Sequence, residues 1–246
     1  MSQPAECTPP LLDVAEQVQD FYDRYPYPAP VESLDQYRRA WQDPRKRRAD
    51  YHLFWPARSY KENYSVLIAG CGTSQAAKHA LRWPAAQVTG VDISTTSVQW
   101  TKTLKRKYSL ANLQVHQLPI DRVAELGTTF DQIVCTGVLH HLADPDAGLA
   151  ALRGVLKPDG AMHLMVYAPY GRAGIYMLQE FCRRLGIRAS DGEIHDLIAA
   201  LGALPGRARH SAFEPALADA PACHCQPRQN RLYSQGRIYP GVSSTR

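Results

Sequence analysis

The fold is decided by the stretch Val66-Leu67-Ile68-Ala69-Gly70-Cys71-Gly72-Thr73-Ser74-Gln75. Its four apolar residues predict a buried strand, and the residues after the glycines predict the start of a helix. Gly70 and Gly72 allow a tight turn between the two and a close approach to the backbone. A ligand can therefore lie at this turn, against the amides at the head of the helix.

Asp92 stands twenty residues after Gly72, at the end of the next apolar run. A carboxylate in that place can accept hydrogen bonds from both hydroxyls of a ribose, whereas the alternative is a capping or turn aspartate. A dinucleotide site would also need a third glycine where Gln75 stands, to admit the pyrophosphate. The pattern therefore favours a nucleoside ligand and argues against a dinucleotide.

Short apolar runs alternate with helical segments from Ser65 onward, which is typical of a parallel sheet covered on both faces. The predicted strands are Ser65–Ala69, Gln87–Asp92, Leu113–Leu118, Gln132–Gly137 and Ala161–Ala168. The fold class that follows is α/β, with a Rossmann-like, doubly wound, mostly parallel sheet.

Helices are predicted between these strands, after Ser74, after Ser94 and over Pro145–Leu156. The last has Asp144 as its N-cap and Pro145 at its first position. Its inward residues are predicted to be Leu149, Leu152 and Leu156. A tight turn is predicted at Lys157-Pro158-Asp159-Gly160.

The flanks of the sheet have a different texture. Residues 9–22 predict an amphipathic helix. Two prolines in the aromatic segment Phe21–Pro28 end this helix, and one further helix is predicted over Leu34–Arg48. After the sheet, helices are predicted over 174–186 and from the capping box Ser190-x-x-Glu193 to Leu201. The proline-rich, arginine-rich residues after Leu204 predict an irregular or disordered tail that contributes little to catalysis. We expect a helical and aromatic lid at 1–62, the main domain at 63–204 and the tail at 205–246.

Composition indicates a soluble protein of the cytoplasm. The chain has 246 residues, 45% of them hydrophobic and 21% charged, and no apolar run long enough to span a membrane. The beginning has no signal-peptide pattern, and six scattered cysteines indicate free thiols. Most of the net charge of +5 falls in the tail, and the block Arg45–Arg48 is interpreted as solvated surface, with phosphate contact as the alternative.

The sequence resembles the class I S-adenosylmethionine-dependent methyltransferases. The resemblance rests on VLIAGCGTS (66–74), GVDIS (90–94), FDQIVCTGVLHHLADP (130–145) and LRGVLKPDGAMHLMVYA (152–168), in the family's order and spacing. It implies a seven-stranded Rossmann-like sheet, S-adenosyl-L-methionine as cofactor, and transfer of its methyl group to an O, N or C nucleophile. The residues expected to hold this donor are Gly70, Cys71, Gly72, Asp92, Ile93, Gln117, Leu118 and Thr136.

Two features depart from the family pattern. Ser74 stands where many relatives have a third glycine, and its hydroxyl is predicted to fit there or to cap the following helix. The region after Leu201 has only Arg237–Tyr239 as a hint of the two further strands that relatives usually have. We therefore expect the sheet to end at five strands, with an exposed edge.

The aromatic segment resembles the lid of a subset of this family. Tyr22, Tyr25 and Tyr27 could form walls that exclude water and favour a sulfonium, whereas the alternative is packing of the rings on the sheet. His140 and His141 follow the fourth strand, where a histidine could take a proton from the acceptor, with packing as the alternative. The catalytic candidates are therefore His140, His141 and Tyr25.

The partner expected from these features is a small hydroxylated or amine metabolite, with protein or RNA as alternative acceptors and no membrane. Cys223-His224-Cys225 with His210 lacks the spacing of a zinc site, so no metal is predicted. Two other classes stay open. One is a noncatalytic donor-binding or interaction protein, and the other is a nucleotide-dependent oxidoreductase, which Gln75 disfavours.

Overall fold

The computed structural model describes residues 14–168, 170–187 and 190–203. It divides into two compact units, the first containing the described residues up to Val166 and the second those from Tyr167. None of the described helices combines the length and apolar character needed to cross a membrane. The described N-terminal helices fall in the same unit as the sheet. The predicted division of the chain into a lid at 1–62 and a main domain from 63 stays a prediction.

Five parallel strands form the centre of the first unit, in the order β3-β2-β1-β4-β5. They are β1 (Ser65–Ala69), β2 (Gln87–Asp92), β3 (Leu113–Gln117), β4 (Phe130–Thr136) and β5 (Leu156–Met165). Every predicted strand is present, and the register pairs Val66 with Val88 on one side and with Gln132 on the other. The further strands that the resemblance implies would fall mostly in residues outside those described, as does the predicted tail.

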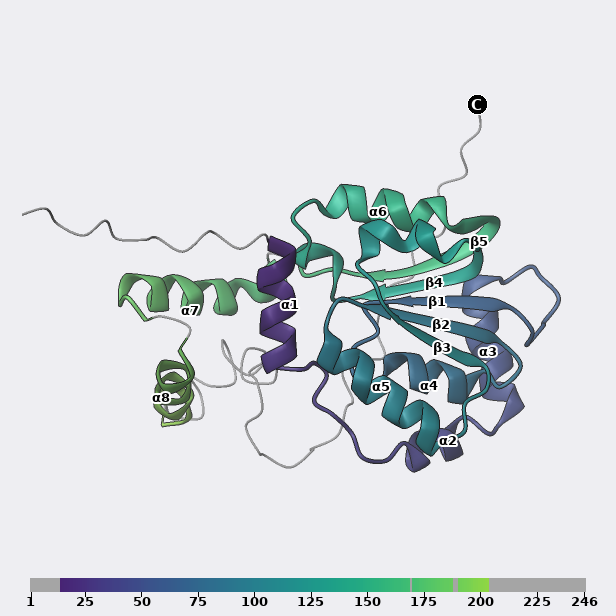
Figure 1. The fold of residues 1–246 in the computed structure, drawn as a ribbon, viewed down its shortest axis with the longest axis horizontal. Helices are drawn as coiled ribbons and strands as arrows, with labels where there is room; N and C mark the ends of the chain where they lie inside the picture. Colours follow the sequence, from purple (N-terminus) through teal and green to yellow (C-terminus); the bar gives the residue numbers. More distant parts are fainter. Residues whose placement is uncertain (1–13, 169, 188–189, 204–246) are drawn as a thin grey trace, which may run out of the picture. The chain divides into compact units, whose positions relative to one another are not determined.

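Helices cover both faces of this sheet, as Figure 1 shows. The connecting helices are α4 (Gln75–Arg82), α5 (Thr95–Lys107), α6 (Pro145–Gly154) and the 3₁₀ helices η1 (Ile120–Leu126) and η2 (Leu139–His141). Asp144 caps α6 as predicted, because its carboxylate accepts the Ala147 amide at 2.9 Å. Leu152 is fully buried as expected, but Leu149 is 37% exposed, so its predicted inward position is wrong.

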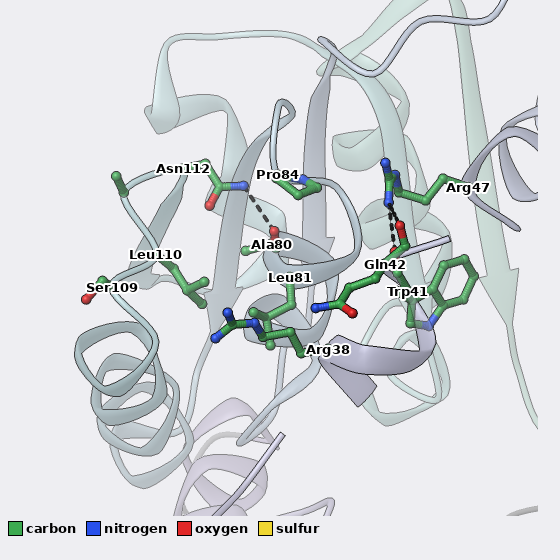
Figure 2. A pocket seen from close by; sticks show the side chains of 11 residues that line it. Arg38, Trp41, Gln42, Arg47, Ala80, Leu81, Pro84, Ser109, Leu110 and Asn112 are labelled. Carbon is green, nitrogen blue, oxygen red and sulfur yellow. Dashed lines mark hydrogen bonds between the residues drawn. The ribbon is translucent and has the colours of Figure 1, made fainter. Parts of the chain in front are cut away.

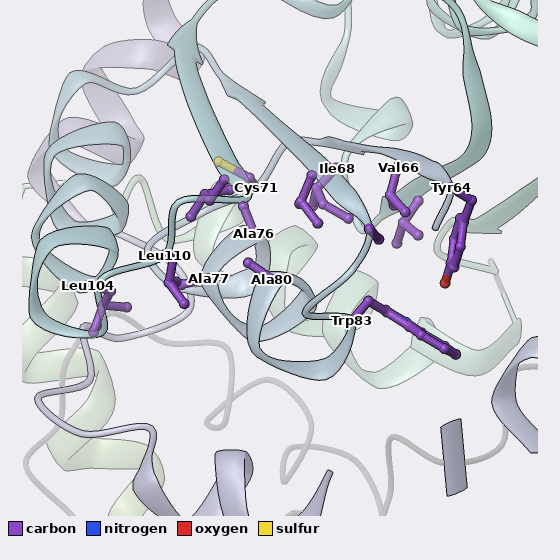
Figure 3. Close-up of a cluster of buried hydrophobic side chains, with 14 of the residues drawn as sticks. Tyr64, Val66, Ile68, Cys71, Ala76, Ala77, Ala80, Trp83, Leu104 and Leu110 are labelled. Atoms are coloured by element: carbon purple, nitrogen blue, oxygen red, sulfur yellow. The ribbon is translucent and has the colours of Figure 1, made fainter. Parts of the chain in front are cut away.

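Two core clusters lie on opposite faces of the sheet. On one face, Figure 3 shows Val66 and Ile68 of β1 above Ala76 and Ala80 of α4, with Trp83 at the helix end. On the other face, the core is mostly aliphatic and includes Leu67, Ile133 and Leu152, together with the aromatic Phe130. The small alanines of α4 allow this helix to pack closely on β1, which fixes the glycine turn between them.

The N-terminal part contains α1 (Val14–Arg24), α2 (Asp35–Ala40) and α3 (Pro44–Phe54). The single helix predicted over Leu34–Arg48 is therefore wrong. The chain starts α3 afresh at Asp43, whose carboxylate accepts the Arg45 amide at 2.9 Å, with Pro44 at the first helical position. Tyr51 and Trp55 then join the α4-side core.

The turn predicted at Lys157–Gly160 is an irregularity inside β5 instead. Phe130 pairs with Leu156, and the ladder resumes only where Gln132 pairs with Ala161. Side-chain bonds hold the intervening residues, since Lys157 reaches Asp131 at 2.8 Å and the Trp55 indole donates to the Asp159 carbonyl at 3.3 Å. The strand also ends at Met165 and not at the predicted Ala168.

In the second unit, the structure describes η3 (Tyr170–Arg172), α7 (Ala173–Arg184) and α8 (Asp191–Gly202). Both long helices agree with the sequence, and Ser190 caps α8 through the Glu193 amide. Ile175 of α7 is buried, but Phe181 and Leu185 are more than half exposed. The predicted apolar face of α7 is therefore only partly buried.

Candidate functional site

The glycine turn joins β1 to α4 at the carboxyl edge of the sheet. Gly70 and Gly72 have φ of +70° and +51°, which residues with a side chain rarely adopt. A Cβ on Gly72 would also lie 2.5 Å from the Tyr27 carbonyl oxygen. Both glycines are therefore required by the turn itself and by the chain that lies against it.

The amides of this turn are engaged within the protein. Gly70 and Cys71 both donate to the Val91 carbonyl at 2.9 Å, and the Gly72 amide donates to Asp92. The Cys71 thiol is buried, and burial, followed by the charge of Asp92, raises its pKa far above the usual value. Cys71 therefore contributes through its backbone.

Asp92 lies at the end of β2, as its spacing predicted, and it faces the glycine turn. Its Oδ2 accepts the Gly72 amide at 2.7 Å and its Oδ1 accepts the Ser94 amide at 2.9 Å. Burial raises the pKa of Asp92, the amides of Ser94 and Gly72 oppose this, and Asp23 adds to it, so the pKa is raised overall. The carboxylate is desolvated yet keeps lone pairs for further donors.

Ser74 does not cap α4, which corrects one of its two predicted roles. It occupies the N-cap position but makes no side-chain cap bond, and its buried Oγ has no partner among the described residues. A buried hydroxyl without a partner is costly, which marks this position as one where a bound group could supply the missing bond.

The aromatic segment lies directly on this edge of the sheet, and Figure 1 shows α1 standing across the strand ends. Asp23 fastens it, because its Oδ1 accepts the Ser94 hydroxyl at 2.7 Å and the Thr96 amide at 2.9 Å at the start of α5. A second fastening follows at the turn, where the Thr73 hydroxyl donates to the Pro28 carbonyl at 2.7 Å. Residues 22–28 thus cover the glycine turn and the Asp92 loop together.

The same segment reaches the predicted histidines. The Tyr22 hydroxyl and His141 Nε2 lie 3.1 Å apart, and the rings of His140 and His141 are 4.2 Å apart. Tyr25 packs instead against Phe21, with ring centroids 5.3 Å apart. The structure thus brings Tyr22 to a histidine.

The other residues that were predicted to bind the methyl donor lie at the ends of the neighbouring strands. The Gln117 amide donates to the Ile93 carbonyl at 3.2 Å and to the Thr95 hydroxyl at 2.9 Å. Leu118 is half-buried, and its amide donates to the Asp92 carbonyl at 3.0 Å. Thr136 ends β4 across the sheet from them. The loops after β2 and β3 are thus bound together beside Asp92.

Sequence reasoning missed Asp23, which anchors the segment, and Ser94 as its partner. The signal was present as an acid between two aromatics in Phe21–Pro28, but the α5 terminus that it caps is seventy residues away.

Among residues 14–168, 170–187 and 190–203, no cluster of three metal-ligating side chains occurs. The Cys223-His224-Cys225 motif lies outside them. In the part of the chain that the structure describes, Cys71, Cys135 and Cys182 are free thiols.

Comparisons with known proteins agree with this architecture. Residues 67–162 match the model of a methyltransferase domain. An uncharacterized protein of Synechococcus sp. is 36% identical over 173 residues, 68% of this chain and 40% of that protein. The ubiquinone biosynthesis O-methyltransferase of Neisseria meningitidis serogroup C is 28% identical over 119 residues, 43% of this chain and 50% of that enzyme. The chain thus spans half or less of the length of these curated relatives.

Among solved structures, PKMT2 from Rickettsia typhi has a similar fold, with a TM-score of 0.55 at 23% identity over 72% of this chain and 36% of that chain. The sheet has a Rossmann-like fold, and residues 67–162 match a methyltransferase domain. Residues 67–162 and the sheet that they form are therefore similar to the class I S-adenosylmethionine-dependent methyltransferases.

Proposed function

We propose that this protein transfers a methyl group from S-adenosylmethionine to an oxygen, nitrogen or carbon nucleophile of a small acceptor. The observation that carries the proposal is the hydrogen bond between the glycine turn and the desolvated Asp92. Residues 22–28 cover both, and Tyr22 of this segment lies beside His141. The methyltransferase-domain match over residues 67–162 supports it.

The residues at this edge fit a nucleoside sulfonium donor. Asp92 has lone pairs left for ribose hydroxyls, and its negative charge favours a cation nearby. Ile93, Gln117 and Leu118 lie where the ribose and adenine would continue along the sheet edge. Gly70, Cys71, Gly72 and Thr136 would meet the methionine end. The donor supplies a methyl group attached to a positively charged sulfur, which makes that carbon electrophilic.

The chain's own contribution is to position groups and to exclude water. Residues 22–28, fastened by Asp23, shield the turn, and a tyrosine ring of this segment that faced the donor would favour its positive charge. When the acceptor is a hydroxyl or an amine, it loses a proton as its new bond to carbon forms. The proposed proton acceptor is His141, which has the Tyr22 hydroxyl beside its Nε2, and His140 and Tyr25 are the other candidates.

The acceptor that we propose is a small hydroxylated or amine metabolite. The relatives named for ubiquinone biosynthesis are O-methyltransferases, which agrees with a hydroxyl acceptor. Protein or RNA remains the alternative, because this fold hosts many acceptors and only the site decides among them.

Two measurements test the proposal in turn. Calorimetric titration with S-adenosylhomocysteine should show one site per chain, and absence of binding by the folded protein would contradict the donor site. Incubation with methyl-labelled S-adenosylmethionine and a pool of small hydroxylated and amine metabolites should then transfer label. Binding without transfer to any metabolite, protein or RNA would assign the noncatalytic alternative.

A further inference from the structure

A pocket lies at the amino edge of the sheet, opposite the edge that carries the glycine turn. Its cavity of about 460 Å³ falls within the range of small-molecule sites. Its walls come from α2, from the end of α4 before β2, and from the residues before β3. Figure 2 shows Arg38 and Gln42 beside Leu81 in this pocket, with Ser109 and Leu110 on its far side.

The two segments that supply most of the pocket lining are rich in basic residues, and two arginines, Arg38 and Arg47, line the pocket itself. Residues 35–62 contain eight Lys or Arg and four Asp or Glu, and residues 95–112 contain four Lys or Arg and no acid. Because the whole chain carries only +5, the rest of it is net negative. These two segments are separate in the sequence but meet at the pocket, whose lining contains no Asp or Glu.

The two arginines of the lining differ in their partners. Arg47 is paired with Glu62, its Nε lying 2.9 Å from Oε1, and it also donates to the Trp41 and Gln42 carbonyls. Arg38 is exposed, and its guanidinium makes no ion pair or hydrogen bond within the described chain. The hydroxyl of Ser109 is likewise without a partner there. Arg38 therefore supplies an uncompensated charge with a fork of donors at the rim.

The floor of the same pocket is apolar. Leu81, Pro84 and Leu110 contribute aliphatic surface, and Trp41 adds an indole that Arg82 covers on one side, with its guanidinium carbon 3.9 Å from the ring centroid. Arg82 is in turn paired with Asp50 at 3.2 Å, so the indole is held in place. A ligand that matched this lining would have an anionic head and an apolar body.

We propose that this pocket is a binding site for a phosphate monoester with a small apolar or aromatic body. A phosphate monoester carries a charge of about −1.5 to −2 near pH 7, which suits the excess of cations better than a single carboxylate does. A guanidinium binds two phosphate oxygens at once, and the Gln42 amide and Ser109 hydroxyl add neutral donors. The pocket is distinct from the glycine turn, so the proposal does not depend on methyl transfer.

The test uses phenyl phosphate as the probe, titrated into the full-length chain by calorimetry, with inorganic phosphate and phenol as its two halves. Phenyl phosphate should bind more tightly than either half. Arg38→Gln should weaken this binding about ten- to a hundredfold. Arg39→Gln is the matched control, because Arg39 is the next exposed arginine of α2 and lies outside the lining, and it should change binding less than about twofold.

A second variant guards against an effect of Arg38 on folding. Ser109 has φ of +50°, a conformation that aspartate tolerates well, so Ser109→Asp should fold and should abolish binding by placing a carboxylate in the pocket. Three results would overturn the proposal: no binding of phenyl phosphate, equal loss in Arg38→Gln and Arg39→Gln, or equal affinity for phenyl phosphate and inorganic phosphate. Equal loss in both variants together with tight binding of polyuridylate would assign the surface to nonspecific RNA contact instead.

Discussion

The two edges of the sheet each carry a half-buried aspartate, and their pKa values shift in opposite directions. At the carboxyl edge, burial raises the pKa of Asp92, and the amides of Ser94 and Gly72 do not offset this. At the amino edge, burial also raises the pKa of Asp131, but Lys157 and Ser65 outweigh it and hold the pKa far below the usual value. Lys157 Nζ, the Ser65 amide and the Ser65 hydroxyl all lie 2.8 Å from Asp131 Oδ2.

The difference separates a structural aspartate from one held for a ligand. Asp131 ties the starts of β1, β4 and β5 together with its charge compensated. Asp92 lies in a desolvated place beside Asp23 and has no cation paired with it in the described part of the chain, which costs stability unless something binds there. Carboxylates perturbed in this way concentrate at functional sites, which supports the carboxyl edge as the donor site.

The largest expected effect compares a glycine from each edge. Gly72→Ala should lower the free energy of unfolding by about 2–4 kcal/mol, because it combines a left-handed backbone with a clash against Tyr27. Gly127→Ala, at the amino edge, has φ of +63° but nothing within 4 Å of the new Cβ, so it should cost only about 1 kcal/mol. Urea unfolding measures both. Equal losses would mean that residues 22–28 do not lie on the turn.

Removing the charge of Asp131 comes next. Asp131→Asn should lower the free energy of unfolding by about 2 kcal/mol at pH 7, since Lys157 loses its partner. Because the folded pKa is below the unfolded one, this stabilisation is fully present above about pH 4 and is lost as the pH falls further. Urea titrations at pH 7 and pH 3 should show the gap between wild type and variant closing. A gap that stays constant would show that the carboxylate is not compensated.

Asp92→Asn should have the reverse profile. We expect affinity for S-adenosylhomocysteine to fall about ten- to a hundredfold, while the free energy of unfolding changes by less than about 1 kcal/mol. Because the pKa of Asp92 is raised in the folded protein, the free energy of unfolding of the wild type should increase as the pH falls through that folded pKa. The variant should lack this increase. Asp121→Asn, at an exposed position in η1, is the control for calorimetry. Unchanged affinity in Asp92→Asn would remove Asp92 from the donor site.

The smallest effect concerns two tyrosine hydroxyls. Tyr22→Phe removes the hydroxyl that lies beside His141, so kcat should fall about three- to tenfold with affinity for S-adenosylhomocysteine unchanged. Tyr60→Phe removes the bond to Glu62 at the amino edge, where burial, followed by that carboxylate, raises the pKa of Tyr60 to about 12. It should leave kcat unchanged. A pH–rate profile of each variant checks whether His141 is the group involved, and a loss of kcat in both would indicate a general effect on folding.

Much of the fold could be predicted because it depends on local patterns. The apolar runs predicted all five strands, and Asp144-Pro145 predicted the start of α6. Asp43-Pro44 carries the same signal, yet α3 was merged with α2 because the charged residues around it have no clear period. The error at Lys157–Gly160 has a different cause. Proline and glycine favour a turn there, but Lys157 is bound to Asp131, twenty-six residues away.

The candidate site could be predicted only in part. Gly70, Gly72 and Asp92 could be linked by their spacing, and the structure adds a hydrogen bond from the Gly72 amide to Asp92 that spacing did not predict. Tyr22 and His141 were both named as candidates, but their pairing spans 119 residues and follows only from the way Asp23 fixes α1 on α5.

The sequence by itself determined where the five strands lie along the chain, where the glycine turn lies, and which acid ends the second strand. These features depend on backbone propensity and burial, which act over a few residues. Only the tertiary structure decided which tyrosine meets a histidine, which aspartate is compensated, and where the basic segments meet. These depend on long-range packing that brings side chains together from separate elements, and the electrostatic environment of each group depends on that packing.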